Sequence, residues 1–548
     1  MITKIKKRVV FACSACCLFT AIVGCSDSFL DRTPSDSFNI DNYYVSDAAL
    51  DAASAPLYNV AWFKYNYRTA IYLGSVRANE AADNYNFKEF SQFQVTGLSQ
   101  LLGAAWESLY AVVTMANSVI DAAENRCSSA VTEAAKTRNV AEARLMRGIA
   151  YFYMVRLWGS VILFENNRKV VDNPLLPLNT EKDVLQFIIN DLTFAAENLP
   201  ATATSKGRAT KWAAEGMLTK VYLARSSWRS KAELAEAGYA NGTRNAEDLA
   251  LAKKYAEDVC KNSGLNLLPA YEDLFKYKHN NNEESLLAMQ WMPLGEWGTQ
   301  NANYADLTIS DVKLNGGVNS WSALFATNEQ LQQYEHADTL RRNATFLTPG
   351  SFYPYINIAG GGYTYKGSDA RNKKGAIGGP NDDNEGKVES MNSPLNTYIL
   401  RLADVYLTYA EACLGNDASL NSGDGLEYFN KVRDRAKVAR KASITLDDII
   451  KERRCEFGME YVNWYEFTTW YKWQPRKMLR YMNNQERGTY YTNLTKNAQG
   501  DIVFVKEDGK EVKPDVVIEV THNNVMLPYP ESDVISNPML RQEPQGYY

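Results

Sequence analysis

Apolar residues recur every three or four positions over several long stretches in the first half of the chain. In the stretch AAWESLYAVVTMANSVIDAAE, for example, Trp106, Leu109, Val113 and Ile120 fall on one stripe. This spacing is typical of an amphipathic helix. The same pattern returns in the segments 137–159, 181–200, 208–228 and 246–264. A Gly or Pro closes several of these segments, as expected at helix ends.

The pattern changes between about residues 280 and 395. This part contains the glycine runs 316–317, 360–362 and 378–379, many Asn and Asp residues, and many Trp and Tyr residues. Such a composition predicts long loops and short strands rather than helices. Helical patterns resume in the segments 396–415, 423–437 and 445–473, and the remaining residues are rich in Pro and turn formers.

Long helices joined by short loops and rich in Ala and Tyr predict stacked helical hairpins. They are similar to tetratricopeptide (TPR) repeats, although the period is irregular. We therefore predict a mostly α fold with a single large domain over residues 41–548. TPR-like helices (about 45–280 and 395–473) would carry an inserted, loop-rich region of short strands that binds ligand (about 280–395). A turn-rich C-terminal segment (about 474–548) would follow.

The first 25 residues have a different character. Lys4, Lys6, Lys7 and Arg8 precede an apolar stretch over 9–23. A basic start and a short apolar stretch are typical of a secretory signal, and about 15 residues are too few to span a membrane comfortably. The residues Ile22-Val23-Gly24-Cys25 resemble a bacterial lipobox. We predict a lipoprotein signal peptide over 1–24, lipidation of Cys25 and a tether over 25–40; the alternative is an unmodified Cys25.

Charge and residue usage argue against several functions. The 59 Lys and Arg residues are fewer than the 64 Asp and Glu residues, so the net charge is −5 and no basic surface for nucleic acid is expected. The three histidines, His279, His336 and His522, are far apart and suggest no metal site. We expect no cofactor and no catalytic residues.

Three carboxylates, Glu452, Glu456 and Glu460, repeat every four residues. On one helix they would form a column, whereas a glycosidase needs two carboxylates on opposite sides of the scissile bond. We interpret them as a structural, solvated or salt-bridged face.

Aromatic residues in polar loops can present flat apolar faces while their N–H or O–H groups meet water. Sugar rings, with apolar C–H faces and polar rims, are suitable partners. Single-stranded nucleic acid also stacks on aromatic rings but needs a positive groove, which the acidic balance disfavours. The candidate ligand-binding residues in the loop-rich region are Trp291, Trp297, Tyr304 and Trp321. The alternative for each ring is packing of its loop onto the helices.

Several segments, taken in order, resemble the SusD/RagB family of outer-membrane nutrient-binding lipoproteins of Bacteroidetes. The segments are CSDSFLDRTPSDSF, WESLYAVVTMANSVID, AEARLMRGIAYFYMVRLWGSV, GRATKWAAEGMLTKVYL, YILRLADVYLTYAEA, IIKERRCEFGMEYVNWYEF and MLPYPESDVISNPMLRQEPQGYY. Departures from the family pattern include Ile162 in place of Pro, Asp404 in place of Glu and Glu543 in place of Asn.

The resemblance implies a non-catalytic lipoprotein that is anchored to the outer membrane and faces the cell exterior. It would capture oligosaccharides, or peptides in some relatives, for a SusC-like TonB-dependent transporter. Asp83, Asn84 and Tyr85 lie at the place that resembles the family's first binding loop. Three alternatives stay open at this point: peptide binding by the same fold, a surface glycosidase, and an adaptor that binds only a protein partner.

Overall fold

The computed structural model describes residues 43–548, apart from 84–85, 316–317, 322–323, 377, 380–381, 383–385, 499, 501 and 505–509. Residues 1–42 lie outside the described part, and so do Asn84 and Tyr85. The predicted signal peptide, the lipidation of Cys25 and the tether therefore stay predictions.

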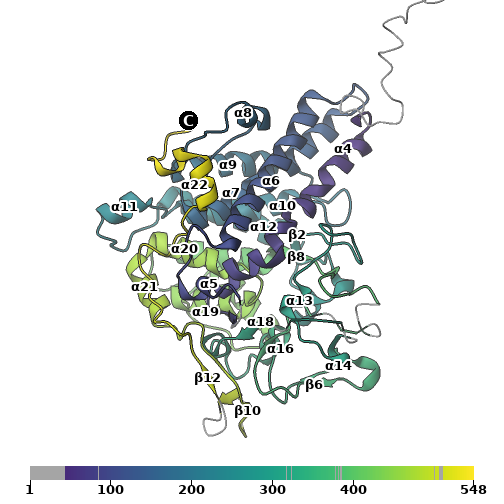
Figure 1. Cartoon of the computed structure of the whole chain (residues 1–548), viewed down its shortest axis with the longest axis vertical. Coiled ribbons are helices and arrows are strands. Elements are labelled where there is room, and N and C mark those ends of the chain that lie inside the picture. Colours follow the sequence, from purple (N-terminus) through teal and green to yellow (C-terminus); the bar gives the residue numbers. More distant parts are fainter. Residues whose placement is uncertain are drawn as a thin grey trace, which may run out of the picture.

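The five helices predicted between residues 100 and 264 are present. They are α6 (Gln100–Asn125), α7 (Glu133–Trp158), α9 (Glu181–Asn198), α10 (Lys211–Arg225) and α12 (Ala246–Asn262). Each packs against the next in the chain, so they form a continuous array in the upper part of Figure 1. Shorter helices lie at the edges of the array: α4 (Asp47–Ser54), α5 (Lys88–Gln92), α8 (Asn167–Asp172) and α11 (Lys231–Glu236). None of the described helices is both long and apolar enough to cross a membrane.

The array continues after the loop-rich region. Its later helices are α17 (Leu402–Leu414), α18 (Asp424–Ala436), α19 (Leu446–Phe457), α20 (Asn463–Trp473) and α21 (Pro475–Asn483). Helix α12 packs directly on α17, although almost 140 residues of chain separate them. The mostly α class of fold is therefore confirmed, and the loop-rich region is inserted between two neighbouring helices.

Two of the later helical segments differ from the prediction. The segment 396–415 begins with a strand, β8 (Thr397–Arg401), which pairs antiparallel with β2 (Ser285–Met289). Its residues TYILR are rich in aromatic and β-branched side chains, which favour strands. The helix of this segment, α17, therefore begins only at Leu402.

The segment 445–473 forms two helices rather than one. Between α19 and α20, Met459 and Tyr461 adopt left-handed backbone angles (φ 63° and 67°). The buried carboxylate of Glu80 accepts hydrogen bonds from the Met459 N–H (2.7 Å) and the Asn463 side chain (2.6 Å). A Cβ at Gly74 would lie only 1.9 Å from the Tyr461 carbonyl oxygen. A glutamate and a glycine far away in the sequence therefore fix this break.

The break between α19 and α20 also changes the predicted column of the carboxylates Glu452, Glu456 and Glu460. Glu460 lies beyond the end of α19, and the carboxylates are buried rather than solvated. They pair with arginines: Glu452 with Arg341 (2.7 Å), Glu456 with Arg401 (2.6 Å), and Glu460 with Arg401 (2.8 Å). The structural interpretation is correct, but the ion pairs form a buried cluster that joins the inserted region to the array.

The inserted region contains short strands and helices of one or two turns. A four-stranded antiparallel sheet has the order β1 (Ala81–Asp83), β3 (Leu324–Ala326), β7 (Arg371–Asn372) and β4 (Phe346–Leu347). A small hairpin consists of β5 (Phe352–Tyr353) and β6 (Tyr363–Thr364). The helices are α13 (Tyr304–Leu307), α14 (Val312–Asn315), α15 (Asn328–Leu331) and α16 (Thr339–Thr345). Because β1 comes from the N-terminal half, this sheet ties the insert to the array; Figure 1 shows the insert at the lower right.

The C-terminal segment folds back over the array. It contains the short strands β9 (Tyr490–Tyr491), β10 (Leu494–Lys496), β11 (Ile502–Phe504) and β12 (Glu511–Val512), followed by α22 (Glu531–Ser536). The Leu527 N–H donates to the Leu157 carbonyl at the end of α7 (2.8 Å), and the Gln545 N–H donates to the Leu178 carbonyl (2.8 Å). In Figure 1 the yellow α22 accordingly lies beside α7 and α9.

Candidate functional site

A break in the helical backbone presents two side chains at the junction of the array and the insert. The chain between α4 and β1 forms short helical turns, among them η2 (Val60–Trp62), η3 (Tyr65–Thr69) and η4 (Ile71–Val76). Within η3 the backbone leaves the helical region at Tyr67 (ψ 106°) and Arg68 (φ 60°). A left-handed conformation at a residue other than glycine costs on the order of 1–3 kcal/mol and persists only when its surroundings hold it.

The insert holds this strained turn in place. The Arg68 N–H donates to the Asn303 side chain (2.8 Å), and the Arg68 Nε donates to the Asp306 carboxylate (3.0 Å). Next to the turn, the buried Asn66 donates to the Asn301 side chain (3.0 Å). The turn is therefore fixed by residues more than 230 positions away, at and just before α13.

Four side chains join into one exposed surface, which we call the aromatic platform: Tyr67, Arg68, Trp297 and Trp321. The Trp297 ring meets the Tyr67 ring edge to face, with centroids 5.5 Å apart. The Arg68 guanidinium lies 5.0 Å from the Tyr67 centroid and 4.6 Å from the Trp321 centroid. Trp297 is 61% exposed and Trp321 is 47% exposed. Exposed rings of this size that gather on one surface make that surface a candidate binding site.

The platform has a rigid support. The buried Phe63 contacts the Trp297 ring from below, with centroids 4.9 Å apart. Phe63 in turn contacts Trp291, which is only 5% exposed and donates its indole N–H to the Thr397 hydroxyl (3.1 Å). On the other side, the loop carrying Trp321 is held because the Ser320 N–H donates to the Ser310 hydroxyl (2.7 Å). These contacts fix the backbone beside Trp321 and leave its ring available.

Two of the predicted residues, Trp297 and Trp321, are therefore brought together on the platform. Trp291 packs in the core beneath it, and its interpretation as a packing residue is favoured. Asp83 is buried at the end of β1, opposite Leu324 of β3, and accepts a hydrogen bond from the Tyr72 hydroxyl. Tyr304 opens α13, two residues before Asp306.

Sequence reasoning missed three residues: Tyr67, Arg68 and Asp306. The only local signal was the dense aromatic run WFKYNY over 62–67, interrupted by an asparagine, which is disfavoured inside a helix. Neither the break after this run nor its partner on α13 follows from periodicity.

Asp306 has unusual protonation behaviour because it is buried. Burial raises its pKa, the ion pair with Arg68 lowers it, and the nearby charge of Asp83 raises it, which gives a pKa of about 6 instead of 3.8. The carboxylate is therefore charged at neutral pH, and it takes up a proton in mildly acidic solution.

We expect binding at the platform to weaken two- to fivefold as the pH falls through about 6. Protonation removes the charge that holds Arg68 between Tyr67 and Trp321. The measurement is calorimetric titration with a neutral oligosaccharide between pH 5 and 8. Asp306→Asn, which keeps the shape but cannot ionise, should bind weakly and with no pH dependence. Parallel pH profiles for the two proteins would contradict this assignment.

The structure also bears on metal binding. Among the described residues, no group of three or more His, Cys, Asp or Glu side chains is arranged to hold a metal ion. His279, His336 and His522 lie in separate parts of the fold.

Comparisons with known proteins add independent information. The model of the SusD family matches residues 355–547, and a model described as "Starch-binding associating with outer membrane" matches residues 28–223. A SusD-like protein from Bacteroides ovatus is 56% identical over 99% of this chain and 98% of its own length. The starch-binding protein SusD from Bacteroides thetaiotaomicron is 24% identical over 72% of this chain and 75% of its own.

Solved structures are similar to the whole fold. One crystal structure, described as a complex with xylogluco-oligosaccharide, has a TM-score of 0.85 at 56% identity, covering 91% of this chain and 99% of its own. Another at the same identity has a TM-score of 0.88 and covers 92% of this chain and 99% of its own. One of these relatives is named a starch-binding protein and another was crystallised with an oligosaccharide, in agreement with the prediction of a non-catalytic protein.

Proposed function

Because the chain belongs to the SusD family, we propose that it is a lipid-anchored protein of the outer membrane that faces the cell exterior. Its proposed role is to capture oligosaccharides and deliver them to a SusC-like TonB-dependent transporter. The observation that carries the binding role is the aromatic platform, in which Trp297 and Trp321 are exposed and linked through Tyr67 and Arg68. An indole face fits the C–H face of a sugar ring, and the guanidinium N–H groups can donate to its hydroxyls.

The platform is suited to capture and release. A shallow surface of stacked rings immobilises little of a glycan and buries a small area, so the affinity stays modest and exchange is fast. A protein that passes its ligand to a transporter needs this behaviour. The relative that was crystallised with a xylogluco-oligosaccharide makes this class of glycan the first candidate ligand.

The experiment that tests this proposal is a binding panel with the purified mature protein. Calorimetry should detect xylogluco-oligosaccharide at micromolar to millimolar concentration, and the same samples should release no new reducing ends after long incubation. Malto- and laminari-oligosaccharides and a peptide pool are the comparison ligands. Binding of peptides without any glycan, or cleavage of the glycan, would overturn the proposal in favour of a peptide receptor or an enzyme.

The proposed anchor gives a separate prediction. Cys25→Ser should move the protein from the membrane fraction to the soluble fraction, because the lipidated cysteine would supply the attachment and each buried CH₂ contributes about 0.8 kcal/mol. Cell fractionation followed by immunoblotting measures this. A Ser variant that stays in the membrane fraction at the wild-type level would contradict lipidation at Cys25.

A further inference from the structure

A second cavity lies far from the aromatic platform. It has a volume of about 360 Å³ and is enclosed by α11, the ends of α7 and α20, and residues 522–529 of the C-terminal segment. Figure 1 shows α11 and α20 at the left of the molecule, whereas α13 and α14 of the insert lie at the lower right. The cavity is close to the smaller end of the range for pockets that hold small molecules.

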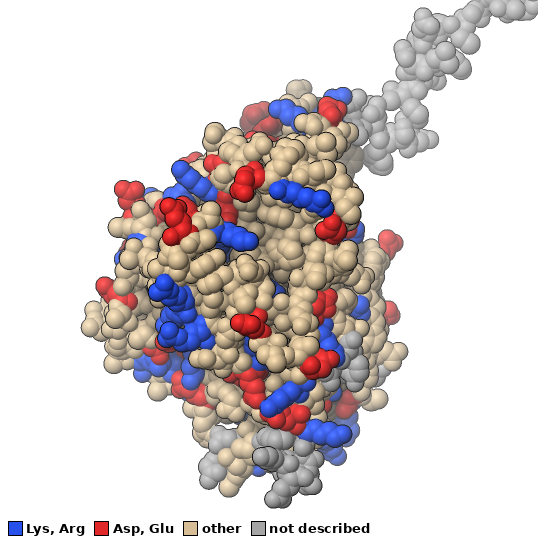
Figure 2. Space-filling model, turned by 60° about the vertical axis from the view of Figure 1, so that its left-hand side comes forward, with Lys and Arg blue, Asp and Glu red and all other residues tan. Residues whose placement is uncertain are grey.

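The cavity is positively charged in an otherwise acidic protein. Its lining contains the cationic side chains Arg77, Lys231 and Lys472 but only one carboxylate, Glu181. The chain as a whole carries a net charge of −5. Figure 2 turns this side of the molecule forward and shows basic and acidic side chains interspersed on its surface, so the excess of positive charge is confined to the lining of the cavity. A hollow lined in this way concentrates small anions.

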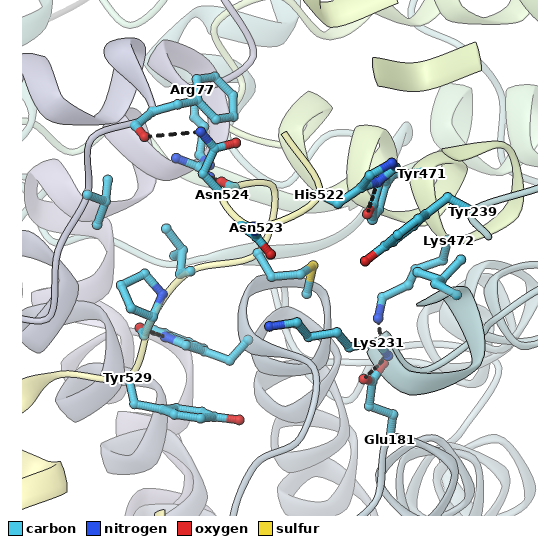
Figure 3. Close-up of a pocket in the computed structure, with 17 residues that line it drawn as sticks. Arg77, Glu181, Lys231, Tyr239, Tyr471, Lys472, His522, Asn523, Asn524 and Tyr529 are labelled. Atoms are coloured by element: carbon cyan, nitrogen blue, oxygen red, sulfur yellow. Dashed lines mark hydrogen bonds and ion pairs between the residues drawn. The ribbon is translucent and has the colours of Figure 1, made fainter. Parts of the chain in front are cut away.

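The lone carboxylate of the lining is already engaged. Glu181 pairs with Lys472 (2.7 Å) and accepts a hydrogen bond from the Trp228 indole N–H (2.6 Å). Lys231, in contrast, is exposed to solvent at the mouth of the cavity and forms no ion pair with any of the residues that the structure describes. Figure 3 shows its ammonium group extending into the middle of the cavity. The first turn of its helix is stabilised by a capping box between Ser230 and Glu233.

Arg77 adds a positive charge at the back of the cavity that has no carboxylate partner, although its guanidinium lies over the rings of Phe93 (4.2 Å) and Trp464 (4.6 Å). It is fully buried, and its Nη2 donates to the backbone carbonyls of Asn524 and Val525. Its Nε and Nη1 have no partner among the described residues. Burial and the neighbouring charge of Arg487 lower the pKa of Arg77. A buried cation without a carboxylate is costly, and an anion nearby would offset that cost.

The remaining walls are aromatic and preformed. Tyr239 stacks on His522 with ring centroids 3.4 Å apart, and the Tyr471 hydroxyl bonds the Nδ1 of His522 (2.9 Å). Trp158 donates its indole N–H to the Pro528 carbonyl (2.9 Å), and Tyr529 donates its hydroxyl to the Ser160 carbonyl (2.8 Å). The polar groups of Tyr471, Trp158 and Tyr529 are thus used for fixing the walls, and the rings line the space.

We propose that this cavity binds one monosaccharide-sized carboxylate, such as a uronic acid, at a site separate from the aromatic platform. The carboxylate pairs with the ammonium group of Lys231, the buried charge of Arg77 adds to the positive potential of the cavity, and the sugar ring fills the space beside Trp158 and Tyr529. The size of the cavity matches a single ring better than an oligosaccharide. This site gives the protein a response to acidic sugars that does not depend on the neutral glycan held at the platform.

The test is a titration of the mature protein, followed by NMR, with glucuronate and galacturonate. Glucose and galactose are neutral probes of the same size. We expect the uronates to bind at millimolar concentration, more weakly at high salt, and the neutral sugars not to bind at this site. Equal binding of acidic and neutral sugars, or no binding of either uronate, would overturn the proposal.

Two variants locate the site. Lys231→Gln should weaken uronate binding at least fivefold, whereas Lys206→Gln, which removes an equally exposed lysine that does not line the cavity, should leave it unchanged. Trp321→Ala should also leave uronate binding unchanged, so this result is independent of the proposed glycan platform. Unaltered binding by Lys231→Gln would contradict the site. Displacement of the uronate by an equal concentration of inorganic phosphate would contradict its assignment to a sugar acid.

Discussion

Trp321→Ala is expected to reduce the affinity for oligosaccharide at least tenfold while the melting temperature changes by about one degree or less. Truncation of a tryptophan at the centre of a binding surface commonly costs about 2 kcal/mol or more, and 1.4 kcal/mol is a factor of ten. The ring is 47% exposed and stacks with Arg68, so its removal creates no buried cavity. Exposed substitutions of this kind stay within about 0.5 kcal/mol of wild-type stability.

Calorimetry and thermal unfolding measure the two parts of this prediction. Trp321→Phe keeps an aromatic face and should lose less affinity than the alanine variant. Tyr548→Ala is a matched control, since Tyr548 is an exposed aromatic residue that contacts Asn190 on α9, in the helical array. A fall of several degrees in melting temperature with unchanged affinity would show that Trp321 is a packing residue.

Glu456→Gln is expected to lower the free energy of unfolding by about 3–5 kcal/mol, the cost of removing one partner of a buried ion pair. Glu456 is fully buried and pairs with Arg401 (2.6 Å), Arg341 (3.2 Å) and Arg435. These arginines come from β8, α16 and α18, so the cluster joins the insert to the helical array. The amide of glutamine keeps the shape of the side chain but removes the negative charge with which all three arginines pair.

The pH dependence gives a second measure of the same effect. Burial alone would raise the pKa of Glu456, but the charges of Arg435, Arg401 and Arg341 outweigh burial and lower the pKa from 4.5 to about 2. The stability that Glu456 contributes is therefore complete above pH 4.5 and disappears as the pH falls toward 2. The difference between the wild-type protein and Glu456→Gln should shrink over that range.

Urea unfolding at pH 7 and at pH 3 to 4 measures both effects. Glu427→Gln is the control, because Glu427 forms an ion pair with Arg440 in which both side chains are about half exposed. Exposed pairs contribute roughly 0–1 kcal/mol, so this variant should unfold nearly as the wild type does. Equal losses in the two variants would mean that the buried cluster contributes no more than a surface pair.

The sequence identified the residues of these two predictions in different ways: Trp321 by the composition of its loop and Glu456 by its spacing from two other glutamates. Trp321 and Trp297 were found from composition, because aromatic rings in polar loops are rare enough to stand out. Trp291 lies in the same kind of loop but is only 5% exposed, and composition cannot separate it from the other two. Exposure depends on what packs over a ring, which is a property of the fold.

The carboxylate column shows the same limit. A spacing of four predicted that Glu452, Glu456 and Glu460 share a helix face. Their arginine partners, however, come from three other elements, and Glu460 lies beyond the helix end. Periodicity reports which residues share a face, but it carries no information on what that face meets.

The sequence by itself determined the helical array, the inserted region and the resemblance to the SusD/RagB family, because these depend on local periodicity, local composition and ordered motifs. Only the tertiary structure decided where the two proposed binding sites are assembled. The turn at Tyr67 and Arg68 exists because Asn303 and Asp306 hold it, and the positively charged cavity exists because the C-terminal segment folds over Arg77. Such sites form from contacts between residues that are hundreds of positions apart, and no local pattern records those contacts.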